Sequence, residues 1–368
     1  MSLSPEALRG YILEEVLAYL IRNTGYRLLV DDSQDPRELG WKHNGLVVRG
    51  RGAVHQVDVL GELRWIPAFT YPLRLFVEAK FRKSRTSVGV VRNLVATLLD
   101  VNQSNLQQID RRNGHTPQLN PKYHYAGAIF STSGFSRDAM DMAFAHGVSL
   151  IDLGTPDFEP LLAEIDRSAR DILGVGVGGE KATGESDFSG PDSRFLLTVR
   201  TALRIQLDTM TASPRRALAD LSQELGPELA PTIRAAQQFA ELFVGMGRGP
   251  YMLVLKADNP SAFLEFAEQE PSHRVTIHWS EDVDDGRTWW IQPTQEPNAY
   301  RLTFRIPDAL GDAVFSSENV TRAALDMKQP HLSEITIYRH ERSRDSLIRL
   351  IFNPERIDRR NVRRVTDE

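Results

Sequence analysis

The chain of 368 residues contains no cysteine. Disulfide bonds, thiolate zinc sites and cysteine nucleophiles are therefore excluded. The chain also has no apolar run as long as a membrane span, and residues 1–6 show no basic segment followed by an apolar stretch, as a signal peptide would. These absences predict a cytoplasmic protein with no membrane partner.

An excess of positive charge is missing too, since the formal net charge is -5. Any contact with nucleic acid must then come from a local basic patch. Hydrophobic residues make up 41% of the chain and charged residues 25%, which is ordinary for a globular protein. The length suits two domains better than one.

The first half of the chain alternates between helical and strand-like patterns. Apolar spacing predicts a helix over 7–22 that ends at Gly25. Further helices are expected over 88–101 and 136–146, and strands over 26–30, 45–48, 54–60, 73–80, 125–130 and 148–151. A strand, a helix and a strand in this order indicate a right-handed crossover. The expected class is therefore α/β, with a partly parallel, mixed sheet flanked by helices.

The second half has a different character. Residues 174–190 contain six glycines among polar residues, which is typical of a flexible linker. We therefore expect a first domain at 1–172, a linker at 173–194 and a separate α+β domain at 195–368. Residues 195–210 fit either a helix or a strand, and 214–226 and 231–246 look helical. Strand-like runs follow at 251–256, 274–279, 289–292, 300–305, 334–338 and 347–352.

Two strand-like segments of the first half carry a set of charged residues. Asp58 lies in one segment, and Glu78-Ala79-Lys80 lies in the next strong one. Residues at i and i+2 of a strand share a face, so Glu78 and Lys80 project together. If the two strands pair, Asp58 meets Glu78. Two carboxylates with the Ala79 carbonyl suit Mg²⁺ or Mn²⁺, and Lys80 beside them is suited to position a water and stabilise charge on phosphorus.

This triplet is a weak signal by itself, because an exposed strand face with an ordinary Glu–Lys pair has the same pattern. The residues around Glu78 and Lys80 are largely apolar, and a charge near a core needs a reason such as a metal. Gln56 shares the expected strand face of Asp58. It either holds a water or a phosphate, or is an ordinary polar residue of that face.

Basic residues gather next to this candidate site. The segment from Arg74 to Arg92 holds six basic residues and one acid. A nucleic-acid backbone would be contacted by the four that follow the strand, namely Arg82, Lys83, Arg85 and Arg92. A solvated surface loop is the alternative. In the second half, Trp279, Trp289 and Trp290 are interpreted as core residues, with a base-stacking surface as the alternative.

Several motifs of the first half follow one another in a fixed order. They are Leu13-Glu14, Gly25-Tyr26, Gly50-Arg51-Gly52 before Asp58, Glu78-Ala79-Lys80 and Ser131-Thr132-Ser133-Gly134-Phe135. In this order the chain resembles the PD-(D/E)xK nucleases of the Mrr-like restriction-endonuclease group, over residues 7–155. It departs from that group in having His55-Gln56 where Gly-Gly is usual, and in a longer segment at 61–71. Residues 195–368 resemble no family that we can name.

The resemblance implies a restriction-endonuclease-like fold and a role for each matched residue. Asp58, Glu78 and the Ala79 carbonyl would be metal ligands, and Lys80 the catalytic lysine. Glu14, rather than its neighbour Glu15, would be an accessory carboxylate on the first helix. The cofactor would be Mg²⁺ or Mn²⁺.

The function expected from residues and resemblance together is an Mg²⁺-dependent endonuclease that hydrolyses DNA in restriction or antiphage defence. The second domain would recognise DNA, bind a partner such as an ATPase, or gate the activity. Two alternatives stay open, a nuclease acting on RNA and a non-catalytic binding or assembly module on a nuclease fold. Homo-oligomerisation also stays open.

Overall fold

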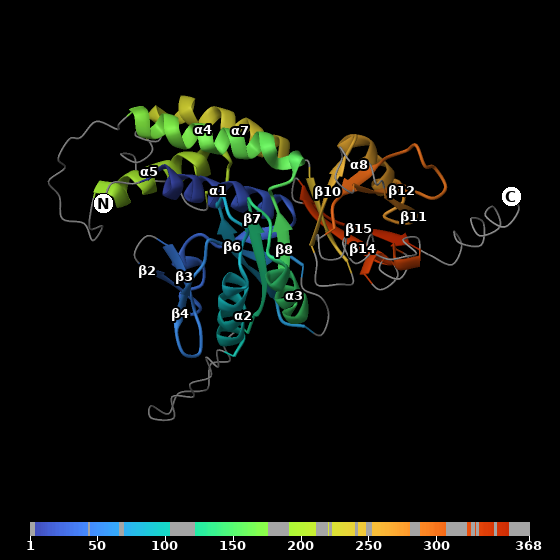
Figure 1. Ribbon diagram of the computed structural model, residues 1–368, viewed down its shortest axis with the longest axis horizontal. Helices are drawn as coiled ribbons and strands as arrows, with labels where there is room; N and C mark the ends of the chain where they lie inside the picture. The colour runs from blue at the N-terminus through green and yellow to red at the C-terminus, as the bar shows by residue number, and fades with distance from the viewer. Residues whose placement is uncertain are drawn as a thin grey trace, which may run out of the picture. The chain divides into compact units, whose positions relative to one another are not determined.

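The computed structural model describes residues 4–42, 45–65, 70–103, 122–175, 191–210, 220, 223–239, 242–247, 252–279, 288–306, 322–324, 328, 331–341 and 344–352. The chain forms two compact units, Met1–Ala139 with Asp152–Gln238, and Met140–Ile151 with Phe239–Glu368 (Figure 1). Both contain helices and strands, so the broad expectation of a two-part α/β protein is confirmed. None of the described helices is long and apolar enough to cross a membrane.

The helices of the first half lie close to their expected positions. They are α1 (Pro5–Asn23), the short η1 (Asp32–Gln34), α2 (Val88–Asn102), α3 (Arg137–His146), η2 (Pro156–Phe158) and α4 (Glu159–Val175). The side chain of Ser4 caps α1 by accepting a hydrogen bond from the N–H of Ala7 at 3.2 Å. Past its end, Gly25 adopts a positive φ of 95°, which favours glycine over other residues. Sequence patterning did not predict α4.

A five-stranded mixed sheet forms the centre of the first half of the chain. Its order is β1 (Tyr26–Leu28), β5 (Val59–Leu63), β6 (Leu73–Lys80), β7 (His124–Ser131) and β8 (Ser149–Asp152). Strands β6 and β7 are parallel, with Leu73 opposite His124 and Lys80 opposite Ser131, whereas β5 and β6 are antiparallel. Strand β6, helix α2 and the parallel strand β7 follow one another along the chain, in agreement with a partly parallel sheet.

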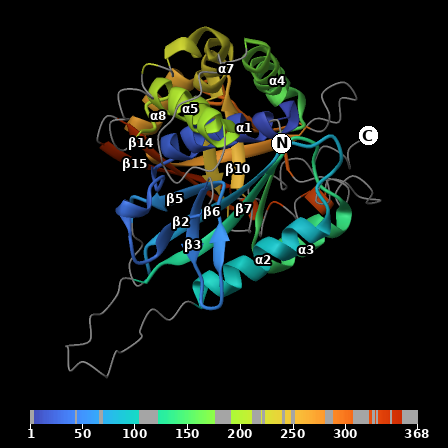
Figure 2. The same cartoon turned by 90° about the vertical axis from the view of Figure 1, so that its left-hand side faces the viewer.

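The helices cover both faces of this sheet (Figures 1 and 2). A side chain at Gly61 of β5 would meet Ile21 of α1, while one at Gly127 of β7 would meet Leu98 of α2. Because these two glycines point to opposite faces, α1 and α2 enclose the sheet between them. Helices α4 and α5 (Pro191–Gln206) pack on α1, and Thr232 of α7 (Gly226–Phe239) donates a hydrogen bond to Ser168 of α4 at 2.9 Å.

The strand expected over 54–60 is wrong as a continuous element. The chain forms β4 (Val54–Gln56) and then β5, which belong to different sheets. Strand β4 joins β2 (Leu39–Lys42) and β3 (Gly45–Arg49) in a three-stranded sheet. The N–H of Val57, just after β4, donates a hydrogen bond to the carbonyl of Leu46 in β3 at 3.1 Å. The change of sheet occurs at Asp58. An alternating pattern cannot reveal such a change, since both sheets impose the same period of two.

The second unit is built around a closed barrel of seven strands. In barrel order the strands are β10 (Met252–Ala257), β13 (Leu302–Phe304), β12 (Trp289–Pro293), β11 (Ser272–Trp279), β15 (Arg344–Phe352), β14 (Glu334–Glu341) and β9 (Leu242–Met246). Helix α8 (Pro260–Gln269) contributes Phe263 to a core that includes Trp289, and both side chains are fully buried. All six strand-like runs expected here are strands, and Trp289 is a core residue as expected.

Two expectations at the junction of the units need correction. The helix expected over 231–246 is wrong in its second half, because α7 ends at Phe239 and β9 follows. The expected boundary at 195 also differs from the observed division, since α5 and α7 belong to the first compact unit. The physical reason is that α5 packs directly on α1. The glycine-rich residues 176–190 lie outside the described residues, as does most of 214–226.

Candidate active site

Asp58, Glu78 and Lys80 meet at the carboxyl end of β6. The antiparallel register pairs Val59 with Val77, so the next position of the register sets Asp58 opposite Glu78. The Oδ2 atom of Asp58 accepts a hydrogen bond from the N–H of Ala79 at 2.8 Å. Lys80 forms an ion pair with Glu78 two positions earlier on the same strand. The structure therefore brings together the three residues that the sequence grouped.

The charges in this cluster are not balanced. Burial, followed by the nearby charge of Glu78, raises the pKa of Asp58 to about 6, against the opposing effects of the Ala79 N–H and Lys80. Two carboxylates in such proximity disfavour each other's ionised form. An added cation would relieve this repulsion, which is a property expected of a metal site.

Glu14 reaches the same place from α1. It lines a pocket together with Asp58, Val57 and Arg200. Burial raises the pKa of Glu14 to about 8, with the charge of Asp58 adding to the shift and Arg200 opposing it. Glu14 is thus close enough to Asp58 for their charges to interact, as the accessory role predicts.

The neighbouring Glu15 has a different environment. Its side chain is only 1% exposed, and the guanidinium of Arg204 binds both of its carboxylate oxygens, at 2.7 and 2.8 Å. Burial alone would raise the pKa of Glu15, but Arg204 and Arg200 outweigh it and hold the pKa below its usual value. The charge of Glu15 is therefore compensated by two arginines, and these ion pairs connect α1 to α5.

Arg200 of α5 is the site residue that sequence reasoning missed. It forms an ion pair with Glu14, and its Nε lies 2.9 Å from Oε1 of Glu15. Arg200 and Arg204 are four positions apart, a spacing that sets both on one helix face. That spacing was the only signal in the sequence, and it does not say which element the face contacts.

Gln56 is the expected site residue whose position in the structure differs from the prediction. The prediction that it shares a face with Asp58 assumed one continuous strand, and that premise is wrong. Gln56 ends β4, is exposed and lies over Gly45 of β3. The proposed contact of Gln56 with a water or phosphate stays a prediction.

The loop after β6 and the first turns of α2 present the expected basic residues. Arg82, Lys83, Arg85 and Arg92 are all exposed. The loop is fixed to the turn after β7, because Thr132 Oγ1 accepts from the N–H of Arg82 at 3.0 Å and donates to its carbonyl at 3.1 Å. The N–H of Thr86 donates to the carbonyl of Gly134, whose positive φ of 68° shapes this turn.

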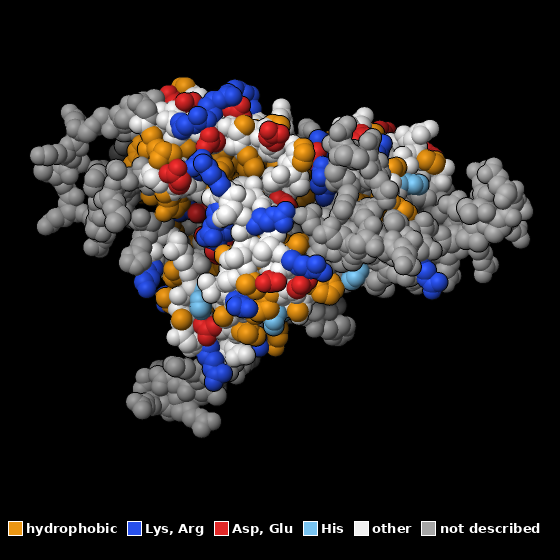
Figure 3. Space-filling model, viewed as in Figure 1, with side chains coloured by type: hydrophobic (Ala, Val, Ile, Leu, Met, Phe, Trp, Pro, Cys, Tyr) orange, Lys and Arg blue, Asp and Glu red, His pale blue; other side chains and the backbone are white. Residues whose placement is uncertain are grey.

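These four basic residues do not make the first unit uniformly basic. On the face drawn in Figure 3, Lys and Arg side chains are interspersed with Asp and Glu side chains over the helices and the sheet. This mixture agrees with the formal net charge of -5. A contact with a polyanion would therefore be local, as the composition predicted.

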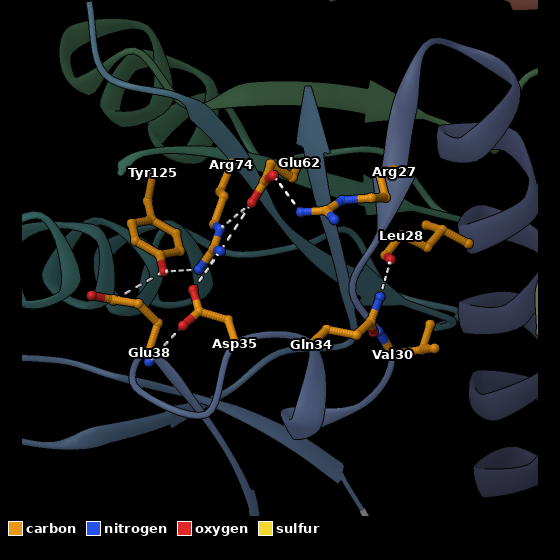
Figure 4. Close-up of polar contacts among 9 residues, drawn as sticks. All are labelled: Arg27, Leu28, Val30, Gln34, Asp35, Glu38, Glu62, Arg74 and Tyr125. Atoms are coloured by element: carbon orange, nitrogen blue, oxygen red, sulfur yellow. Dashed lines mark hydrogen bonds and ion pairs between the residues drawn. The ribbon is translucent and has the colours of Figure 1, made fainter. Parts of the chain in front are cut away.

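Arg74, the first basic residue of the segment from Arg74 to Arg92, has a different environment. Its side chain is 1% exposed and lies in a polar cluster at the other end of β6 (Figure 4). The guanidinium binds Asp35 at 2.6 Å, Glu62 at 2.9 Å and the hydroxyl of Tyr125 at 3.1 Å. Charges at the two ends of this strand therefore have different surroundings. Arg74 is thus unavailable to a nucleic acid.

The donor atoms at Asp58 and Glu78 are of the right kind for a hard divalent cation. Two carboxylates and the Ala79 carbonyl would hold Mg²⁺ or Mn²⁺, with Glu14 as a further oxygen ligand. Within the described ranges, no three acidic or histidine side chains already converge in a metal-binding arrangement. Full coordination would therefore require movement of the Glu78 side chain, which is engaged by Lys80.

Comparison with known proteins does not assign the chain to a family. No family model matches it, and no curated protein matches it. One solved structure, of a protein of unknown function called AF1548, is similar to it with 15% sequence identity and a TM-score of 0.32. The similarity covers 62% of this chain and 98% of the other. At this level it carries no conclusion about function.

Proposed function

We propose that the chain is a metal-dependent endonuclease that hydrolyses phosphodiester bonds in DNA, with a restriction-endonuclease-like first unit. The observation that carries the proposal is the meeting of Asp58 with Glu78 and Ala79 across the β5–β6 ladder, with Lys80 beside them. The raised pKa of Asp58 adds support, because it reports excess negative charge where a cation is needed.

In this mechanism the chain's own residues supply binding and charge. Asp58, Glu78 and the Ala79 carbonyl would hold Mg²⁺ or Mn²⁺, which acts as a Lewis acid on the phosphate. Lys80 stabilises the negative charge that develops on the phosphoryl oxygens and orients the attacking water. Arg82, Lys83, Arg85 and Arg92 contact the phosphates on either side of the cleaved bond.

The biological role is proposed on the resemblance alone. It is restriction or antiphage defence in the cytoplasm, with the activity gated by the second unit or by a partner such as an ATPase. The alternatives are cleavage of RNA and a non-catalytic binding module. The ion pair that engages Lys80 favours the second alternative, because its amine would have to be released before catalysis.

The test is a cleavage assay on plasmid, linear duplex, single-stranded DNA and RNA, with Mg²⁺, Mn²⁺ or EDTA. We expect metal-dependent cleavage of DNA by the wild type and at least about 100-fold slower cleavage by Lys80→Ala. Lys122→Ala is the matched control, since this exposed lysine precedes β7 at the end of the sheet remote from Lys80. Equal rates for the Lys80 variant and wild type would refute the proposal, and metal binding without cleavage would favour the non-catalytic module.

A further inference from the structure

A row of four charged side chains leads from the α1–α5 interface into the candidate site. Arg204 binds Glu15, Glu15 also contacts Arg200, and Arg200 binds Glu14. All four side chains are less than one-fifth exposed. Because α5 supplies both arginines, a helix outside the segment that resembles known nucleases takes part in the geometry of this site.

From this geometry we propose that Arg200 is a positioning residue, which holds the Glu14 carboxylate in place for the metal at Asp58 and Glu78. The inference rests on the proposed metal site. Arg200 engages the Oε2 atom of Glu14, and no hydrogen bond to Oε1 is described in this part of the chain. One carboxylate oxygen is thus fixed by the arginine and the other is left to a metal ion or its water. Hydrogen-bonded partners orient metal-binding carboxylates in this way.

The connection to Glu15 argues for a permanent role rather than a removable latch. Glu15 is almost completely inaccessible, so its charge must be compensated by both arginines. If Arg200 swung away to expose the site, it would leave Glu15 with half of its partners in an apolar surrounding. The interaction that keeps α5 on α1 therefore also keeps Arg200 beside Glu14.

The positive charge of Arg200 also has an opposing effect on metal binding. A guanidinium near Asp58 repels a divalent cation, and removing it would strengthen metal binding if repulsion were its main effect. Positioning predicts the opposite change, because Glu14 without Arg200 is a buried carboxylate with no fixed orientation. The direction of the change in metal affinity therefore separates the two effects.

The test measures the affinity of the full chain for Mn²⁺, with electron paramagnetic resonance as the readout and no substrate present. We expect Arg200→Ala to weaken Mn²⁺ binding about 10-fold, and Arg200→Lys to recover part of the loss. Arg204→Ala is the matched control. It removes an ion pair between the same two helices but leaves the Arg200–Glu14 contact, so its Mn²⁺ affinity should stay within about twofold of wild type.

Three results would overturn the inference. Unchanged or tighter Mn²⁺ binding by Arg200→Ala would exclude positioning, and tighter binding would identify Arg200 as a competitor of the metal. Equal weakening by Arg200→Ala and Arg204→Ala would assign the effect to helix packing. Asp58→Asn separates these results from a failure of the metal site itself. If wild type and Asp58→Asn bind Mn²⁺ equally, the proposed site is absent and the role of Arg200 is lost with it.

Cleavage provides a second measurement. For Arg200→Ala we expect a higher Mg²⁺ concentration for half-maximal activity with an unchanged Kd for DNA. A weakened Kd for DNA at saturating Mg²⁺ would instead show that Arg200 contacts the substrate, and would contradict a positioning role.

Discussion

The two ends of β6 carry charged clusters of opposite character. At one end Arg74 is surrounded by two carboxylates and two tyrosines, and the ring of Tyr123 lies only 3.3 Å from its guanidinium carbon. At the other end Asp58 and Glu78 face each other, with Lys80 as a single nearby cation on the strand. In the first cluster each charge has an oppositely charged or hydrogen-bonding partner, whereas in the second the two carboxylates repel each other.

The two clusters suggest a criterion that separates a structural ion pair from a candidate ligand site on the same strand. Buried charges that stabilise a fold are paired and hydrogen-bonded on all sides. Charges kept in repulsion beside a pocket destabilise the folded chain and persist where a ligand relieves them. Burial alone does not make the distinction, since both clusters are largely removed from solvent.

The largest expected effect breaks the satisfied cluster. Arg74→Met leaves Asp35 and Glu62 without their buried partner, and removal of one member of such a pair costs about 3–5 kcal/mol. We expect a loss of this size in the free energy of unfolding, measured with urea, while Mn²⁺ binding by the folded variant stays unchanged. Arg27→Ala is the control, because this half-exposed arginine also binds Glu62 but should cost less than about 1 kcal/mol. Equal costs for both variants would contradict a special role for the buried cluster.

A smaller effect, of opposite sign, is expected at the unsatisfied cluster. The pKa of Asp58 is raised from 3.8 to about 6, so the folded chain retains a proton that the unfolded chain releases in this range. Stability contributed by this group is therefore lost as the pH rises from about 4 to 6. Asp58→Asn removes the part of the pH dependence that Asp58 contributes, and it should be more stable than wild type by about 1–3 kcal/mol at pH 7, with little difference at pH 4.

This comparison requires metal-free protein, because a bound cation would cancel the repulsion. Thermal unfolding in EDTA across this pH range measures it, with Asp171→Asn on the exposed face of α4 as the control. Parallel stability curves for wild type and Asp58→Asn would show that Asp58 is not under electrostatic strain.

The smallest effect on stability is expected in the basic loop. Arg82→Ala and Arg85→Ala should each change the free energy of unfolding by less than about 0.5 kcal/mol, since both side chains are exposed. Each should still lower the slope of log Kobs for DNA against log salt by about 1. Fluorescence anisotropy over a salt series measures the slope, with the exposed Arg167 of α4 changed to alanine as the control. A slope that does not change would exclude phosphate contacts by these arginines.

The local pattern was enough to predict most elements of the first sheet. The strand expected over 73–80 is β6, and the helix expected over 88–101 agrees with α2. Short-range signals sufficed there because each element has one strong period and is bounded by turn residues. The grouping of Asp58 with Glu78 was predicted for the same reason, since it needed only the pairing of two neighbouring strands.

Three features could not be derived in this way. The change of sheet at Asp58 separates Gln56 from the site, and both sheets share the same period. The burial of Arg74 depends on Asp35 and Glu62, which come from distant segments. Helix α5 was left open between helix and strand, and its partner helix lies about 190 positions earlier in the chain.

From the sequence alone, the available chemistry can be read: two carboxylates and a lysine in two strand-like segments, basic residues after them and no cysteine. Which charges are paired and which repel one another follows from the packing of the folded chain. It placed Arg200 beside Glu14 and enclosed Arg74 between its partners. The physical reason is that the state of a charge depends on burial and on neighbours within a few ångströms, and these neighbours are chosen by packing rather than by position in the chain.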